Sequence, residues 1–168
     1  MKANRVVSQE EGLAADEGLE VVTTRVIDAP RELVFKAWID PKHMARWWGP
    51  HGFTTPVCEL DVRVGGVGRI VMRGPDGAEH PMKAVFREDV ENERLVFSNV
   101  PVDEAGAPLL DGETIVTFAE QGRKTKLTVQ TRAVALDERA KPMLKGMEAG
   151  WAQTIERLAT YLENARRD

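Results

Sequence analysis

Apolar and polar residues alternate along most of the chain between residues 54 and 136, and this period of two predicts β-strands. Turn-forming residues separate the strands, as at Gly65-Gly66 and from Gly74 to Gly77. Because these connections are short, we expect an antiparallel meander with one apolar face. The expected strands are Val57 to Val64, a strand ending near Arg73, a strand through Met82, Ala84 and Phe86, and residues 95–100, 114–118 and 124–136.

Two short helices are predicted between Asp28 and Pro50. Asp28 or Ala29 is expected to cap the first helix, with Pro30 in its opening turn. Asp40-Pro41 ends this helix and repeats the same signal for the second, which stops at Gly49-Pro50.

Trp47 and Trp48 follow one another near the end of the second expected helix. Successive helical residues point about 100° apart, so we expect that both cannot face the same core. One of them is predicted to sit at an edge. Two interpretations stay open, in which both are core aromatics or one lines the mouth of a pocket.

A helical period returns at the C-terminal end and predicts one long helix from about residue 139 to residue 165. Gly146 and Gly150 lie four apart on one face of it, and each costs about 1 kcal/mol relative to alanine. Either another backbone approaches these glycines closely, or they leave room for a ligand above Met147 and Trp151.

These elements predict an α+β fold in which the sheet curls around the long helix and the two short helices close an open end. The domain is expected to cover residues 20–168. Residues 1–19 are acidic and poor in aromatic residues, which is typical of a mobile tail.

Composition and charge exclude several classes of function. The chain has 168 residues, 42% hydrophobic residues and a formal charge of −4, and it offers no basic stripe for nucleic acid. No apolar run is long enough for a membrane span or a signal peptide, so we expect a cytoplasmic protein. The single cysteine, Cys58, falls among apolar positions and is predicted to be an inert thiol. Homodimerisation is compatible with the sequence but has no specific signal in it.

The sequence contains no recognisable catalytic or metal-binding motif. The three histidines His43, His51 and His80 lack metal-ligand spacing, and no nucleophile has an adjacent base. We therefore predict no metal, no cofactor and no catalytic residue, and favour a non-catalytic protein.

A chamber between the sheet and the long helix is the expected site. A dry, empty chamber of ~300 Å³ would cost about 7 kcal/mol, so side chains, water or a ligand must occupy it. The inward positions Met72, Met82, Phe86, Phe97, Met147, Gly150 and Trp151 are the predicted lining, with the polar His80 and Thr131 among them and Trp48, His51 and Phe53 near the mouth.

Six motifs follow one another along the chain: R-x-I-D-A-P-x-E-L-V-F-x-A-W from Arg25, D-P-x-H-x-x-x-W-W-G-P from Asp40, D-x-R-x-G-G from Asp61, P-D-G from Pro75, E-R-L-V-F from Glu93 and G-M-x-x-G-W from Gly146. In this order they resemble the motifs of the activator-of-heat-shock-protein-ATPase-homologue-like proteins in the START-like SRPBCC superfamily. The resemblance implies a helix-grip fold, in which a curved antiparallel sheet grips the C-terminal helix around a cavity. Members of this superfamily bind lipids, hormones and polyketides, and some are cyclases or hydrolases.

Three functions follow as hypotheses. The leading one is binding of a small hydrophobic or amphipathic molecule in the cavity. The second is a cyclase- or hydrolase-type enzyme in which His80 or His51 moves a proton. The third is a stress-related or co-chaperone-like adaptor that binds a protein through the Trp47-Trp48 edge.

Overall fold

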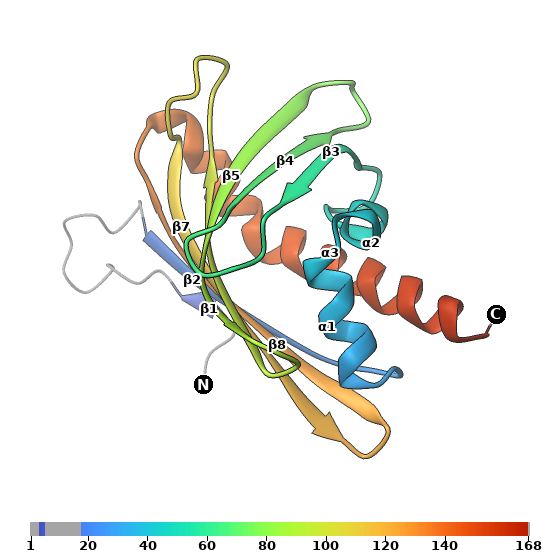
Figure 1. Ribbon diagram of the computed structural model, residues 1–168. Coiled ribbons are helices and arrows are strands. Elements are labelled where there is room, and N and C mark those ends of the chain that lie inside the picture. The colour runs from blue at the N-terminus through green and yellow to red at the C-terminus, as the bar shows by residue number, and fades with distance from the viewer. Residues whose placement is uncertain (1–3, 6–17, 168) are drawn as a thin grey trace.

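A single curved sheet forms most of the molecule (Figure 1). The computed structural model describes residues 4–5 and 18–167, with side chains for 18–165. The eight strands of the sheet lie in the order β1-β2-β8-β7-β6-β5-β4-β3, and every neighbouring pair is antiparallel. The strands are β1 (Asn4–Arg5), β2 (Gly18–Ile27), β3 (Thr54–Leu60), β4 (Val67–Arg73), β5 (Glu79–Val90), β6 (Arg94–Pro101), β7 (Leu110–Gln121) and β8 (Lys124–Ala135).

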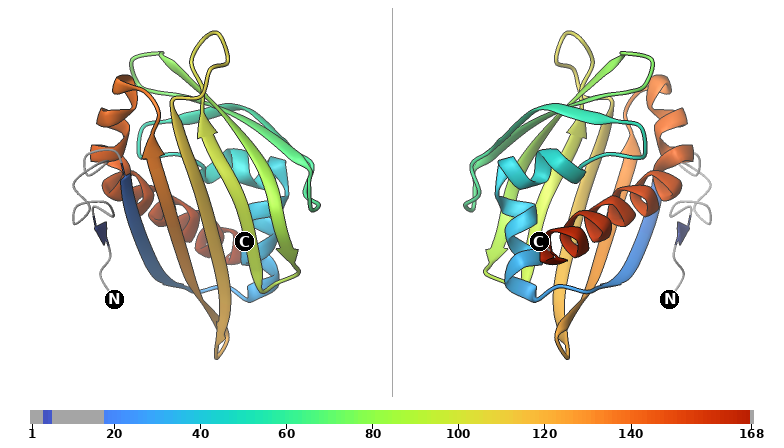
Figure 2. Two further views of the ribbon diagram at one scale, coloured as in Figure 1. Left: turned by 90° about the vertical axis from the view of Figure 1, so that its left-hand side faces the viewer. Right: turned by 90° about the vertical axis from the view of Figure 1, so that its right-hand side faces the viewer.

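The concave face of the sheet holds the C-terminal helix α3 (Lys141–Arg167), which follows a short 3-10 turn, η1 (Glu138–Ala140) (Figure 2). Alternation explains which residues face α3. In β8, the buried residues are every second one, from Thr125 to Ala135, and the residues between them face outward. The predicted α+β helix-grip architecture is confirmed.

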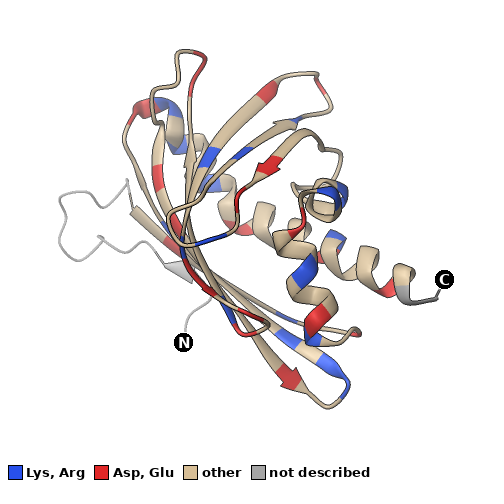
Figure 3. Ribbon diagram, viewed as in Figure 1, with Lys and Arg blue, Asp and Glu red and all other residues tan. Residues whose placement is uncertain are grey.

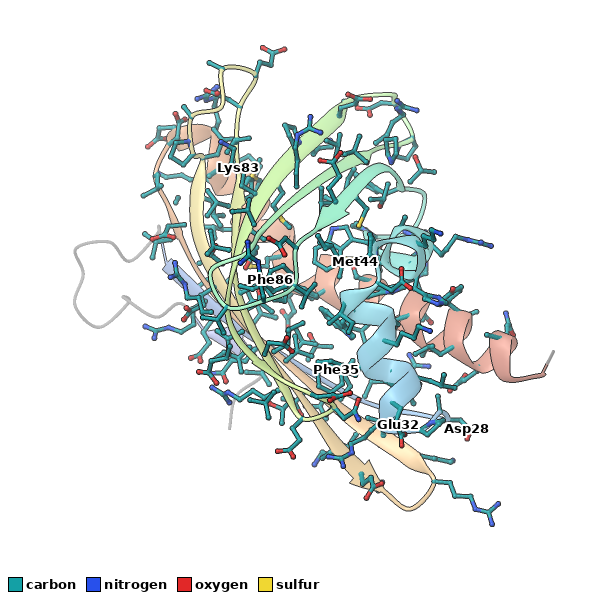
Figure 4. The ribbon with its side chains drawn as sticks, in the orientation of Figure 1. Asp28, Glu32, Phe35, Met44, Lys83 and Phe86 are labelled. Carbon is teal, nitrogen blue, oxygen red and sulfur yellow. The ribbon has the colours of Figure 1, made fainter. Side chains whose placement is uncertain are left out.

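The two short helices α1 (Arg31–Ile39) and α2 (Pro41–Trp47) lie beside α3 at one end of the sheet (Figure 2). Phe35, labelled in Figure 4, lies on the sheet side of α1 and contacts Phe118 with ring centroids 5.2 Å apart. Asp40 caps α2 as predicted, because its carboxylate accepts a hydrogen bond from the Lys42 backbone N–H at 2.9 Å. The cap predicted for α1 is wrong: Pro30 itself is the N-cap residue, with no side-chain cap.

Both adjacent tryptophans are buried, so the prediction that one sits at an edge is wrong. The exposed fraction is 0% for Trp47 and 6% for Trp48. The 100° argument fails because Trp48 is no longer helical: it is the C-cap of α2, with φ −66° and ψ 134°, and this extended backbone turns its ring inward. Trp38 of α1 packs against both rings in the centre of the core.

The first predicted strand of the meander ends earlier than expected. β3 stops at Leu60, and the chain turns through residues 61–66, which leaves Val64 69% exposed. The turn is tight because the backbone of Gly66 lies against that of Asp61, where a Cβ on Gly66 would lie 1.9 Å from the Asp61 carbonyl oxygen.

The predicted tail at 1–19 falls mainly on residues 1–3 and 6–17, outside the described residues. Within it, β1 pairs with β2, and β2 already begins at Gly18. No helix among the described residues is long and apolar enough to cross a membrane. Acidic and basic residues are interspersed along the strands and helices in the view of Figure 3.

Candidate functional site

A cavity of about 320 Å³ lies between the first half of α3 and one end of the sheet. It opens to solvent where His80, Pro142 and Gly146 are exposed. Its walls come from α3, from β4, β5 and β6, and from the segment that follows α2. The lining residues are Trp48, Gly49, Pro50, Phe53, Met72, His80, Pro81, Met82, Asn99, Pro101, Pro142, Met143, Gly146, Met147, Gly150, Trp151 and Thr154.

The two glycines of α3 face this cavity. A Cβ built on Gly146 would have no atom within 4 Å, and one on Gly150 would meet only Pro50 Cγ at 3.9 Å. No other backbone approaches them closely, which excludes the first explanation for their presence. The glycines instead leave open space on the face of α3 that carries Met147 and Trp151.

The strand residues reach the cavity because of their register. Met72 of β4 pairs with His80 of β5, and Met82 of β5 pairs with Pro101 of β6, so these four residues share the concave face. Asn99 lies two residues before Pro101 and therefore points to the same side.

The segment after α2 forms the remaining wall, and α3 holds it in place. Arg157 Nη1 donates to the backbone carbonyls of Trp48, Gly49 and Pro50 at 3.3, 2.9 and 3.0 Å. Burial lowers the pKa of this guanidinium below its usual value. Gly49 has φ +104°, a backbone conformation that glycine adopts without strain.

Aromatic rings and thioethers dominate the lining. The Trp48 and Trp151 rings meet edge to face at 5.6 Å, and Trp151 stacks on Trp38 at 6.4 Å. The Phe53 ring lies 5.9 Å from His80. Four methionines contribute flexible, polarisable side chains that adapt to different shapes.

No Lys, Arg, Asp or Glu lines the cavity, and its polar side chains are Asn99, His80 and Thr154, beside the indole N–H groups of Trp48 and Trp151. The Thr154 hydroxyl donates to the Gly150 carbonyl oxygen at 2.7 Å, so its proton is occupied. His80 forms no hydrogen bond to any described residue. Within the described part of the chain, no three His, Cys, Asp or Glu side chains are grouped closely enough to hold a metal ion.

Asn99 ends a buried polar chain. Its Oδ1 accepts from Thr114 Oγ1 at 2.7 Å, and Thr114 Oγ1 lies 2.9 Å from Thr131 Oγ1. Both threonines are fully buried. The predicted inward residue Thr131 therefore lies behind the cavity wall, where it supports Asn99 through Thr114.

The structure brings eight of the eleven predicted site residues to this cavity, namely Trp48, Phe53, Met72, His80, Met82, Met147, Gly150 and Trp151. Phe86 and Phe97 do not line it. They contact each other in the main core, and Phe97 also contacts Trp38.

His51 also lies outside the lining. Its side chain is 53% exposed, and Nε2 lies 2.8 Å from the Glu156 carboxylate on α3. Gln153 Oε1 accepts from its backbone N–H at 3.2 Å. These contacts hold the loop against α3 and direct the imidazole toward Glu156.

The sequence reasoning missed Pro81 on β5, Asn99 and Pro101 on β6, Pro142, Met143 and Thr154 on α3, and the backbone wall at 49–50. A signal for Asn99 existed, because the period of two from Phe97 places Asn99 and Pro101 on the same face. The position of the Gly49-Pro50 wall had no such signal, because it depends on the remote Arg157.

Cys58 contributes no chemistry to the site. It is partly buried beside the core, and desolvation, followed by the charges of Asp40 and Glu59, raises its pKa to about 11. A thiol with this pKa is almost entirely protonated at neutral pH and is a weak nucleophile.

The fold and the cavity define a helix-grip protein of the SRPBCC type. The chain belongs to the family described as Activator of Hsp90 ATPase homolog 1-like protein, whose family model matches residues 28–163. This family and fold are those of ligand-binding or activator-type proteins.

Solved structures agree. A Chromobacterium violaceum protein is 30% identical, with a TM-score of 0.75, over 86% of this chain and 96% of that one. A Rhizobium leguminosarum protein is 26% identical, with a TM-score of 0.75, over 88% and 96%. An Arthrobacter aurescens protein is 27% identical, with a TM-score of 0.71, over 90% and 88%. A comparison with curated proteins gave no match.

Proposed function

We propose that the protein binds a small apolar or amphipathic molecule, without catalysis, in the cavity between the sheet and α3. One observation carries this proposal: a cavity of about 320 Å³ has aromatic and thioether walls, no charged lining residue and two helix glycines that keep it open. This volume falls within the range of small-molecule sites, which run from about 300 to 1,000 Å³. Displacing water from such walls favours an apolar occupant.

Thermal unfolding in the presence of small lipids, aromatic compounds and polyketides tests the proposal. At a free ligand concentration one hundred times Kd, binding adds about 2.7 kcal/mol of stability. This corresponds to an increase in Tm of about 5–10 °C for a chain of this length. Native mass spectrometry should show the same compounds bound with one-to-one stoichiometry.

A matched pair of variants locates the site. Gly146→Leu places an isobutyl group in the cavity and should abolish binding, whereas Ala149→Leu adds a similar group to an exposed position of α3 outside the lining. Ala149→Leu should bind as the wild type does. Equal binding by all three proteins would refute the cavity as the site.

Binding of a protein partner is a second candidate, because the family description refers to an activator of a chaperone ATPase. The Trp47-Trp48 edge is buried and offers no surface for it. Val64 and Val67 are 69% and 57% exposed near the β3–β4 turn, and we propose them as the contact residues instead. A partner that binds the wild type and not a Val64→Ser, Val67→Ser double variant would support this role.

Of the two histidines considered for an enzymatic role, only His80 lies at the cavity. It is exposed at the mouth, beside Phe53. A cytoplasmic location and a homodimer remain predictions from the sequence.

A further inference from the structure

We propose that Asn99 orients the ligand, and that the ligand is an uncharged ring compound with one hydrogen-bond acceptor, such as a carbonyl oxygen, that binds the Asn99 amide nitrogen. This inference rests on the proposed function and adds the chemical class of the ligand. Asn99 is a lining residue with a buried side chain, 7% exposed, whose amide nitrogen donates to no described residue, and its amide oxygen is fixed by the protein.

The Asn99 side chain is held in one orientation by its neighbours. Its Oδ1 accepts the Thr114 hydroxyl proton at 2.7 Å, and Thr131 lies 2.9 Å from Thr114 on the opposite side. Each hydroxyl carries one proton, so the Thr131 proton goes to Thr114 and the Thr114 proton goes to Asn99. The amide oxygen of Asn99 is thereby occupied.

The amide nitrogen of Asn99 is available. Nδ2 donates no hydrogen bond to any described residue, although Asn99 lines the cavity. A donor at the edge of an apolar cavity favours an occupant that accepts its proton, because leaving the donor unpaired costs free energy.

Gly112 makes room for this arrangement. It lies opposite Asn99 in β7, and a Cβ there would be 2.7 Å from the Asn99 carbonyl oxygen and 3.1 Å from Nδ2. Any side chain at position 112 would displace the amide from the wall. The strand pair therefore provides a built position for Asn99.

The other walls indicate a flat, neutral molecule. Trp48, Trp151 and Phe53 present ring surfaces, which favour aromatic contacts. A charged ligand would lose its hydration without meeting an opposite charge in the lining. Arg157, the cation behind the wall, already donates to three backbone carbonyls and does not line the cavity.

Three naphthalene probes of similar shape test the inference: acetylnaphthalene with an acceptor, ethylnaphthalene without a polar group, and naphthoate with a negative charge. Their affinities for the full chain are measured by calorimetry. We expect acetylnaphthalene to bind about fivefold more tightly than ethylnaphthalene, the effect of one hydrogen bond between neutral groups. Naphthoate should bind more weakly than either.

Variants assign the preference to Asn99. In Asn99→Leu, the ratio of the two neutral affinities should fall to about one, because the donor is lost while apolar contact remains. In Thr114→Val, the amide is free to turn, so the ratio should fall part of the way. Circular dichroism confirms that each variant is folded, and the ratio is insensitive to a uniform loss of stability.

The outcomes separate this inference from the proposed function. If no probe binds the wild type or any variant, the proposed function fails. If the neutral probes bind but show equal affinities, or if the ratio is unchanged in both Asn99→Leu and Thr114→Val, the role of Asn99 is refuted while the cavity remains a binding site. Naphthoate binding as tightly as acetylnaphthalene would refute the neutral ligand class.

Discussion

Replacing Gly146 by alanine should stabilise the protein, because this glycine lies in a helix without the close contact that usually requires one. Alanine is favoured over glycine in a helix interior by about 1 kcal/mol. The added methyl group would meet no atom within 4 Å, so no steric cost offsets this gain. The expected increase in Tm is about 2–4 °C for a chain of this length.

Thermal unfolding followed by circular dichroism measures the effect, and a second helix glycine provides a parallel test. Gly150→Ala should raise Tm by a similar amount, because its nearest neighbour, Pro50 Cγ, is at an ordinary contact distance of 3.9 Å. Gly112→Ala is the contrasting variant and should lower Tm, since its methyl group would lie 2.7 Å from the Asn99 carbonyl oxygen.

A lower Tm for Gly146→Ala would refute the reasoning. It would mean that the space above this turn of α3 is filled in solution. The cavity, and with it the proposed site, would then be absent in solution.

Three further predictions concern the turn, the acidic residues and the thiol. Gly66→Ala should cost about 3 kcal/mol or more in chemical denaturation, because its methyl group would lie 1.9 Å from the Asp61 carbonyl oxygen. Hydrogen bonds from the Arg139 side chain and backbone lower the pKa of Asp137 from 3.8 to about 2. Stability from this contact should therefore be complete above pH 4 and decline as pH falls toward 2, and Arg139→Ala should flatten this decline in a pH series of unfolding measurements. Because burial raises the pKa of Cys58 to about 11, iodoacetamide should modify it far more slowly in the native protein than in the unfolded chain at pH 8.

Each of these three predictions has a result that would contradict it. A Gly66→Ala variant with wild-type stability would show that the turn has another conformation. An unchanged pH profile in Arg139→Ala would remove the Asp137 contact as its cause, and equal native and unfolded alkylation rates would place the thiol at the surface.

Local pattern was sufficient for most of the fold. The period of two in β8 places Leu127, Val129 and Ala133 inside, and the structure buries all three. The Asp40-Pro41 pair predicted the start of α2 because capping depends only on residues within one turn. The placement of Gly146 and Gly150 on one face of α3 was likewise predictable, because it depends only on their spacing of four residues.

Predictions of side-chain direction from periodicity were wrong where a residue lies just outside a regular helix or strand. Trp48 follows the last helical residue, and its extended backbone reverses the direction that a helical projection assigns to its ring. Phe86 and Phe97 have the predicted phase, but phase specifies only the face of the sheet. The structure packs the two rings against each other in the core, where Phe97 also contacts Trp38 of α1.

The sequence by itself determined most strands of the meander, the long helix and the α+β class, because side-chain periodicity follows from backbone geometry over a few residues. The family followed from the resemblance of its ordered motifs. The tertiary structure alone decided which of the inward residues share one cavity, that Arg157 anchors the Trp48 to Pro50 wall, and that Thr114 and Thr131 direct Asn99 toward it. The physical reason is distance along the chain: these contacts join segments many residues apart, and only the packed sheet and helix bring them together.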